Sequence, residues 1–311
     1  MPALTVAFCT FNRAARLERL VAALRAQQCP VDFDILAVNN NSRDDTLATL
    51  AHLQALPGAP LRYVTEAEPG IVPARNRALQ EAADSTYLVF IDDDELPHPG
   101  LLLAAYDALA NEGADCVGGK VEIDFQPHGR PAWLGNDLLG FLAAVDHGPQ
   151  AFWIRDASTP VWTSNIAYRL SYLQTHDLRF DARYNRQGNS ATSPGGGEDH
   201  VMLARLLELQ ARIRYRPDMC VDHGVEIERL NRRYFVRLHY RAGLRKGLHE
   251  LPAYTRTCLG VPPFLVAQSL THSAKALLML LALRDGWLRQ AMNAAHALGL
   301  LTGYRQRHEA R

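Results

Sequence analysis

Apolar runs alternate with segments of helical period along the first 120 residues. The run at residues 4–9 (LTVAFC) predicts a short strand, and leucines at helical spacing then predict a helix over 14–27. The same order recurs after the apolar runs FDILAV, LRYVT and TYLVFI. This alternation predicts an α/β fold in which a Rossmann-like, mostly parallel sheet has helices on both faces.

Polar clusters follow three of these predicted strands. TFNR ends the first strand, NNNS ends the second, and the acidic cluster DDDE, residues 92–95, ends the fourth. In parallel sheets ligands bind beyond the carboxyl ends of the strands. We therefore expect the three clusters to meet at one edge of the sheet.

The carboxylates of the acidic cluster repel one another unless water, a helix N-terminus or a cation offsets their charge. Its Asp-x-Asp pattern, Asp92 and Asp94, offers the hard oxygen ligands that suit Mg²⁺ or Mn²⁺, and such ions keep positions open for phosphates. Solvated helix capping is the simpler alternative for the same residues.

The alternation breaks after about residue 120. Residues 124–163 predict loops and short strands, and 161–170 predict another strand. A glycine-rich loop at 188–197 leads into a helix predicted over 198–210, which carries two carboxylates in its first turn. That loop is expected either to close over a bound donor or to be a plain surface loop.

Composition narrows the choice of function. The 311 residues are 48% hydrophobic, which fills a globular core, and 33 basic residues balance 33 acidic ones. This balance gives no argument for a nucleic-acid partner. Five scattered cysteines without a Cys-x-x-Cys pair, and a start that does not resemble a signal peptide, favour the cytoplasm.

The remaining motifs leave alternatives open. TFNRAARL lacks the glycines of a P-loop or a dinucleotide fingerprint, which disfavours NAD binding and ATP hydrolysis. The amides of NNNS can read a base edge or form a turn, and Arg75 can meet a phosphate or remain a solvated charge. His223, after a late strand, is a structural residue or a metal ligand.

Taken in order, these clusters resemble family 2 glycosyltransferases with the GT-A fold. The pattern runs from TFNR through NNNS, GIVPARN, DDD, SNIA and GED to a strand that ends in histidine, and it covers residues 4–224. The motifs EPGIVPARNRAL and FIDDDELP are most similar to the bacterial enzymes that build exopolysaccharide and other surface glycans.

The resemblance implies roles for individual residues. Asp199 would be the catalytic base, with Glu198 orienting the acceptor, and Asp92, Asp94 and His223 would hold Mn²⁺ or Mg²⁺. The sugar and acceptor pocket would include Trp162, Ser164 and Asn165. The nucleotide-sugar contacts would be Thr10, Asn12, Arg13, Asn39, Asn41, Arg75, Asn76, Asp92, Asp93 and Asp94. Asn39 stands where the family commonly has Asp, so UDP is favoured while the nucleotide stays open.

The expected activity is metal-dependent, inverting transfer from a UDP-sugar to a glycan or a polyprenyl-diphosphate-linked acceptor. The domains expected are 1–120 for the nucleotide sugar, 121–224 for acceptor and catalysis, and 225–311 as a helical region. Alternatives are a catalytically silent nucleotide-sugar-binding protein and, less favoured because Glu95 follows Asp-x-Asp, an aspartyl phosphatase. A sugar-nucleotide pyrophosphorylase would need a glycine-rich first loop, which TFNRAARL does not provide.

The predicted C-terminal helices carry a basic strip with arginine at every fourth position from Arg229 to Arg245. The uninterrupted apolar run that follows, 276–283, is far shorter than the roughly 20 residues that span a bilayer. We expect these helices to lie on the inner face of the cell membrane, to form a homodimer or to pack on the catalytic core.

Overall fold

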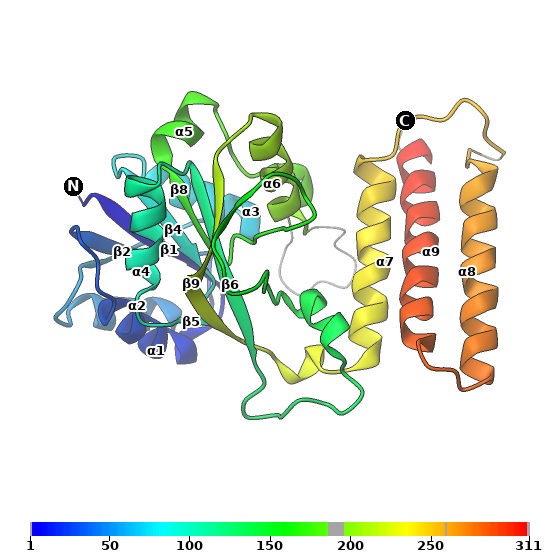
Figure 1. Cartoon of the computed structure of the whole chain (residues 1–311), viewed down its shortest axis with the longest axis horizontal. Helices are drawn as coiled ribbons and strands as arrows, with labels where there is room; N and C mark the ends of the chain where they lie inside the picture. Colours follow the sequence, from blue (N-terminus) through cyan, green and yellow to red (C-terminus); the bar gives the residue numbers. More distant parts are fainter. Residues whose placement is uncertain (1, 186–195, 259, 310–311) are drawn as a thin grey trace. The chain divides into compact units, whose positions relative to one another are not determined.

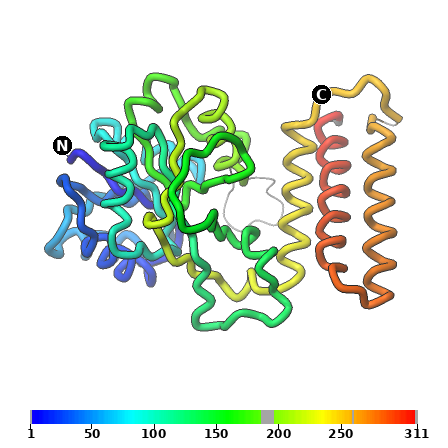
Figure 2. The backbone as a smooth tube through the Cα atoms, viewed as in Figure 1, coloured from blue at the N-terminus to red at the C-terminus, as the bar shows by residue number. Residues whose placement is uncertain are grey.

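The computed structural model describes residues 2–185, 196–258 and 260–309. It divides into two compact units, one formed by Met1–Gly188 and Glu198–Val225 and the other by Asn189–Gly197 and Glu226–Arg311. Figure 1 and Figure 2 trace the chain through both units. The glycine-rich loop predicted at 188–197 lies outside the described residues except for its last two glycines.

Within the described part of the first unit, nine strands form one sheet of order β3-β2-β1-β4-β8-β6-β9-β5, with β7 paired to β9. The strands are β1 Leu4–Thr10, β2 Phe33–Asn39, β3 Leu61–Thr65, β4 Tyr87–Ile91, β5 Glu95–Pro97, β6 Cys116–Asp124, β7 Phe152–Ile154, β8 Asn165–Arg169 and β9 Ile213–Gly224. The predicted α/β class with a central, mostly parallel sheet is confirmed.

The strands β1 to β4 pair only in parallel with one another, as the alternating pattern predicted. Their helices are α1 Ala14–Arg25, α2 Thr46–Gln54 and α3 Ile71–Glu81. Because parallel crossovers are right-handed, α1 and α2 cover one face of the sheet, and α3, whose crossover runs back across the sheet, covers the other. Because β1, β2 and β4 run parallel, their carboxyl ends lie at one edge of the sheet.

The second half of the sheet mixes strand directions. β8 runs antiparallel between β4 and β6, whereas β6 and β9 are parallel with a register shift between Gly119 and Lys120. The short β5 pairs antiparallel with the end of β9, which sets Glu95 opposite His223. The helices here are α4 Leu101–Tyr106, α5 Leu170–Thr175 and α6 Glu198–Glu208.

One core holds this unit together. The helical positions predicted to face inward in α1, among them Leu17, Leu20 and Leu24, are buried, as are Val6 and Phe8 of β1. Each such side chain contributes roughly 1.5–3 kcal/mol when it leaves water. The core therefore fixes the strand ends, and polar loops are left to form the site at the sheet edge.

The second unit is helical, as predicted, with α7 Arg232–His249, α8 Pro263–Leu281 and α9 Trp287–Glu309. α7 and α9 pack closely because each presents a Gly-x-x-x-Gly face. A Cβ atom placed on Gly243 would lie 2.1 Å from the carbonyl oxygen of His296, and one on Gly303 would lie 2.1 Å from that of Leu244.

In the part of the chain that is described, α8 alone is long and apolar enough to cross a membrane by length and composition. The unbroken apolar run 276–283 begins within α8, and the rest of this helix carries few charges. Most of α8 is exposed within this chain.

Candidate active site

The first two polar clusters interlock at the ends of β1 and β2. Thr10 pairs with Asn39 in the parallel register, and the backbone N–H of Asn40 donates to the Thr10 carbonyl at 2.8 Å. Side chains then tie the loops: the Asn12 N–H donates to Ser42 Oγ, and the Arg43 N–H donates to Asn12 Oδ1. The two loops form one surface at the sheet edge.

The asparagines of the second cluster also shape their own loop. Asn39 is fully buried; its Oδ1 accepts from the Ser42 N–H at 3.1 Å, and its Nδ2 donates to Thr65 Oγ1 at 3.3 Å. Asn41 is exposed and has a left-handed backbone with φ of 59°. The turn that the sequence offered as an alternative to base reading is therefore formed.

Arg75, on α3, gathers three carboxylates. Its Nη1 lies 2.7 Å from Asp199 Oδ1 and 2.8 Å from Glu198 Oε1, and its Nη2 lies 3.3 Å from Asp92 Oδ1. The guanidinium is 4% exposed and also stacks over the ring of Phe180. Burial would lower the pKa of Arg75, but the three carboxylates outweigh burial and raise it, so this arginine stays charged.

The start of α3 is built to place Arg75. Gly70 precedes the helix with φ of 125°, and a Cβ there would overlap the side chain of Asn185. Asn76 fixes the next turn, since its Nδ2 donates to the Phe180 carbonyl and its Oδ1 accepts from the Phe180 N–H, both at 2.9 Å. Asn76 thus holds the segment whose ring lies against Arg75.

A second group forms where β5 meets β9. His223 Nδ1 lies 3.4 Å from Asp94 Oδ1 and 3.6 Å from Glu95 Oε1, and both His223 and Glu95 are buried. Arg16, on α1, approaches Asp94 Oδ2 at 3.8 Å. The strand pairing therefore brings the histidine that ends β9 to the acidic cluster that follows β4.

These buried acids and the histidine titrate far from their ordinary ranges. Burial raises the pKa of Glu95 to about 8, although His223 opposes the shift. Burial would lower the pKa of His223, but Asp94 and Glu95 outweigh it and raise the pKa to about 10. Burial also raises the pKa of Asp93 to about 7 and that of Glu198 to about 7. Perturbed groups cluster at functional sites.

The residues predicted for the sugar and acceptor pocket flank these two groups. Trp162 lies against His200, with ring centroids 4.7 Å apart, and so reaches the residue after Asp199. The Ser164 carbonyl accepts from the Asp92 N–H at 3.2 Å. Asn165 is buried and its Nδ2 donates to the carbonyls of Lys120 and Met219, which ties β6 to β9 at their register shift.

The donor set around Asp94 fits a divalent cation. Carboxylates of Asp92 and Asp94 with the imidazole of His223 are ligand types that Mn²⁺ accepts, and Mg²⁺ takes the carboxylates. The 3.4 Å between His223 Nδ1 and Asp94 Oδ1 suits two ligands of one ion. Asp92 links the two groups, because its Oδ1 lies 3.3 Å from Arg75 Nη2 and its backbone N–H donates to Glu95 Oε2 at 3.4 Å.

The structure thus brings Asp92, Glu198 and Asp199 together around Arg75, and Asp94 to His223. Sequence reasoning missed Glu95 and Arg16 as members of this region. Glu95 stood in the acidic cluster, but only the pairing of β5 with β9 shows that it faces His223. Arg16 lies in the first turn of α1, and no local pattern distinguishes it from a solvated arginine.

Comparison with known proteins shows to which family the chain is similar. The model described as Glycosyl transferase family 2 matches residues 5–176. Glycosyltransferase AglE of Haloferax volcanii is 26% identical over 133 residues, which are 42% of this chain and 43% of that relative. The match therefore spans less than half of the relative's own length.

Solved structures share the fold. A mannosyltransferase, PcManGT from Pyrobaculum calidifontis in complex with GDP-Man and Mn²⁺, aligns with TM-score 0.61 and 19% identity over 96% of this chain and 87% of its own. S. aureus TarS 1-349 in complex with UDP-GlcNAc aligns with TM-score 0.56 and 17% identity over 99% and 90%. At these identities the likeness shows the fold.

The chain belongs to glycosyl transferase family 2, and its fold is of the GT-A type. The family that the sequence motifs indicated is confirmed, and with it the class of enzyme, a glycosyltransferase.

Proposed function

We propose that this chain transfers a sugar from a nucleotide diphosphate donor, a UDP-sugar by preference, to a hydroxyl group of a glycan or lipid-linked acceptor. One observation carries the proposal: Arg75 holds Asp92, Glu198 and Asp199 in one cluster, and Asp94 of the same acidic turn meets His223. A carboxylate that can accept a proton therefore stands next to a set of ligands suited to a diphosphate-bound cation.

We assign the metal to Asp92, Asp94 and His223. When bound there, Mn²⁺ or Mg²⁺ supplies charge that stabilises the leaving nucleoside diphosphate. The relative PcManGT was solved with Mn²⁺, which supports a divalent ion without choosing between the two. Asp93 lies on the same turn with Thr10 beside it, and both are assigned to the donor side.

Asp199 is assigned as the base that takes the proton from the acceptor hydroxyl. Arg75 binds Asp199 Oδ1, which fixes the carboxylate, and the 22% exposure of this side chain lets an acceptor reach it. Glu198 is nearly buried beside it and orients the acceptor. Attack from the side opposite the departing diphosphate inverts the anomeric centre in one displacement.

The donor nucleotide is assigned to the loops after β1 and β2. Asn12, Arg13, Asn39 and Asn41 lie on these loops, and Asn39 Oδ1 retains a second lone pair beside its bond to the Ser42 N–H. That lone pair suits the N3–H of uracil once the loop after β2 opens, because Asn39 is fully buried in the free chain. UDP in the TarS complex and GDP in the PcManGT complex are the two nucleotides to compare.

A donor panel tests the activity. The purified full chain is incubated with UDP-, GDP- and dTDP-sugars and Mn²⁺, and release of the nucleoside diphosphate is followed without an acceptor. Slow hydrolysis of one donor, abolished by a chelator, is expected. Binding of a donor with no turnover, even when polyprenyl-diphosphate-linked or free glycan acceptors are added, would instead make the chain a nucleotide-sugar-binding protein.

The acceptor proposal includes a membrane surface. α8 exposes Leu278 and Leu281, each at least two-thirds exposed, and the preceding α7 carries arginines that suit anionic headgroups. We propose that the chain associates peripherally with the inner face of the cell membrane and acts there in surface-glycan synthesis. A homodimer formed through the same helices is the competing explanation for the exposed apolar face of α8.

Cosedimentation with anionic vesicles tests this part. Leu278→Gln with Leu281→Gln in the full chain should reduce vesicle binding, whereas Leu47→Gln, an exposed leucine of α2, should not. Equal vesicle binding by both variants would exclude α8 as the contact. A change from dimer to monomer in the first variant, without vesicle binding by the parent, would favour the homodimer.

A further inference from the structure

A second group of metal-ligating side chains lies on β6, on β9 and just after β5, outside the candidate catalytic cluster. Successive side chains of a strand point to opposite faces of a sheet. On β9, His223 points to the face that holds Glu95, so Cys220 and Asp222 lie on the opposite face of the sheet. Glu122 of β6 pairs with Asp222, and the His98 N–H after β5 donates to the Cys220 carbonyl.

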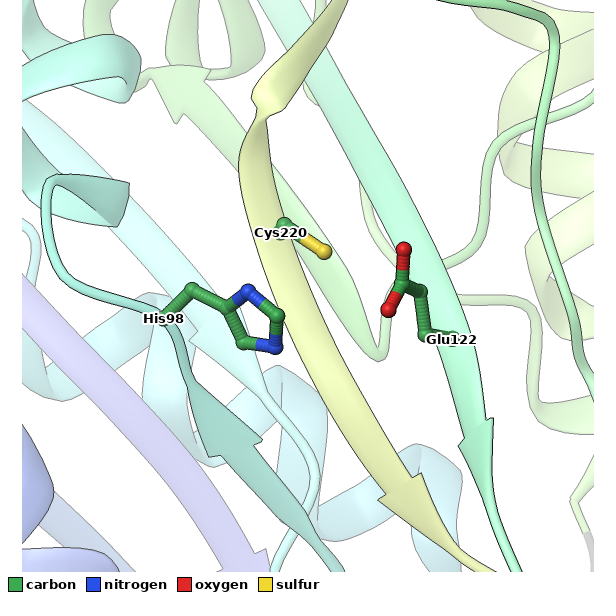
Figure 3. A group of neighbouring side chains, drawn as sticks. All are labelled: His98, Glu122 and Cys220. Atoms are coloured by element: carbon green, nitrogen blue, oxygen red, sulfur yellow. The ribbon is translucent and has the colours of Figure 1, made fainter.

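Three of these side chains converge. One ligand atom each from His98, Glu122 and Cys220 lies within 4.8 Å of the other two. Figure 3 shows the imidazole and the carboxylate extending toward each other across β9, with the thiol of Cys220 on the strand between them. Cys220 is buried, whereas the other two side chains are partly open to solvent, which gives an ion a route in.

The chemistry of this set differs from that of the Asp92–Asp94 site. A thiolate and an imidazole are softer ligands than carboxylate oxygen and suit Zn²⁺ rather than Mg²⁺. Asp222 Oδ1 lies 3.1 Å from His98 Nε2. A carboxylate that accepts from one ring nitrogen fixes the imidazole so that the other nitrogen can bind a metal, as in many zinc sites.

An ion-pair network competes for one member. Lys120 Nζ lies 2.5 Å from Glu122 Oε1 and 3.3 Å from Asp146 Oδ2. That network explains why Glu122 is there, and a carboxylate has a second oxygen for another partner. It does not explain why a buried thiol and a carboxylate-bound histidine face the same point.

We propose that His98, Glu122 and Cys220 bind a zinc-class divalent cation, with Asp222 orienting His98 or completing the ligand set. The ion would join β6, β9 and the residue after β5 on the face of the sheet opposite His223. Since β5 carries Glu95 and β9 carries His223, an ion bound here would also fix the two strands that position the proposed metal ligand His223 and its neighbour Glu95. The site itself does not depend on the proposed activity.

Cobalt substitution tests the site in the full chain. Co²⁺ bound to a thiolate gives a near-ultraviolet charge-transfer band, which a site of carboxylates and imidazole alone does not give. We expect the band to appear with one equivalent of Co²⁺ at this site and to be displaced by Zn²⁺. Cys220→Ser should abolish it, and His98→Gln, at a more exposed position, should weaken it without threatening the fold.

Matched cysteine variants separate this site from other thiols. Cys9 lies near Arg75 and Asp92, and Cys258 is exposed in the helical unit. Cys9→Ser and Cys258→Ser should both keep the band. Asp94→Asn should keep it as well, which distinguishes this site from the proposed catalytic metal even if transfer activity is never found.

Two further variants test the neighbours. Asp222→Asn should weaken Zn²⁺ binding by roughly 10- to 100-fold, as loss of a partner to a metal-bound histidine does. Lys120→Met should tighten it, because the competing cation beside Glu122 is removed. Absence of the band in the parent protein, its survival in Cys220→Ser, or no change in Zn²⁺ affinity in both neighbour variants would overturn the proposal.

Discussion

The Arg75 Nη1 atom donates to Asp199 Oδ1 at 2.7 Å, although the two residues lie 124 positions apart in the sequence, on α3 and α6. The same nitrogen reaches Glu198, and the other terminal nitrogen reaches Asp92. A planar guanidinium with a fixed fork of donors suits this task better than a lysine. The proposed base is therefore positioned by a buried arginine that also contacts the acidic cluster after β4.

Removing this arginine should destabilise the fold. Arg75→Met leaves the buried Glu198 and the partly buried Asp92 and Asp199 without their counter-charge. Breaking a buried ion pair such as Arg75–Glu198 typically costs about 3–5 kcal/mol. Arg75→Lys keeps the charge but loses the forked pair of donors. Its free energy of unfolding should lie between those of the parent and Arg75→Met. Urea unfolding of each variant gives the measurement.

Arg77→Met is the control for this series, since Arg77 lies on the same helix but pairs with Glu81 in a partly exposed position. It should lose no more than about 1 kcal/mol. Equal losses in Arg75→Met and Arg77→Met would mean that the buried cluster contributes no more than a surface pair.

Asp199→Asn should fold and bind donor but transfer poorly. Loss of a general base typically lowers the rate by roughly 10²- to 10⁴-fold, and the amide still accepts from Arg75 through its carbonyl oxygen. Transfer rates and donor affinity are measured side by side. Glu208→Gln, an exposed change on the same helix, should leave both unchanged; parental turnover in Asp199→Asn would assign the base elsewhere.

Much of the fold followed from local patterns in the sequence. The strands β1 to β4 were predictable because each is a mostly apolar run, and the inward face of α1 because leucines recur at a period of 3.6 residues. Parallel strands also end at one edge of the sheet. The place of His223 was not predictable from periodicity. It depends on β5, a strand of three residues, pairing antiparallel with the end of a strand from much later in the chain.

The roles of the amides show a similar limit. Asn76 and Asn165 both stood in motifs that suggested ligand contacts, and the structure shows each bonded to backbone groups of a distant segment, Asn76 to Phe180 and Asn165 to Met219. A single sequence does not show which distant carbonyl an amide will meet. Carboxylates were easier to interpret, because a crowded acidic turn requires compensation wherever it lies.

Asp94→Asn should abolish metal-dependent donor binding. The amide keeps the shape of the side chain but loses the charge that would hold the cation next to His223. Calorimetric titration of UDP with Mn²⁺ and with a chelator provides the comparison. Asp84→Asn, an exposed position just before β4, should behave as the parent does. If UDP binds the parent equally well with and without chelator, the metal assignment fails.

Glu198 should make the stability of the protein depend on pH. Burial, and next to it the charge of Asp199, raise the pKa of Glu198 from an ordinary value of 4.5 to about 7 in the folded chain. A carboxyl whose pKa is higher in the folded state stabilises the fold fully below pH 4.5, and this contribution is lost as pH rises through about 7. The expected loss is on the order of 1–3 kcal/mol.

Glu198→Gln removes this titration, so its free energy of unfolding should change less than that of the parent between pH 4.5 and 7.5. Denaturant unfolding at several pH values within that window measures the difference. Glu208→Gln on the exposed side of α6 serves as control and should follow the parent's pH profile. A parent whose stability rises across the window, with Glu198→Gln rising in parallel, would show that Glu198 stays ionised beside Arg75 and that the arginine outweighs burial.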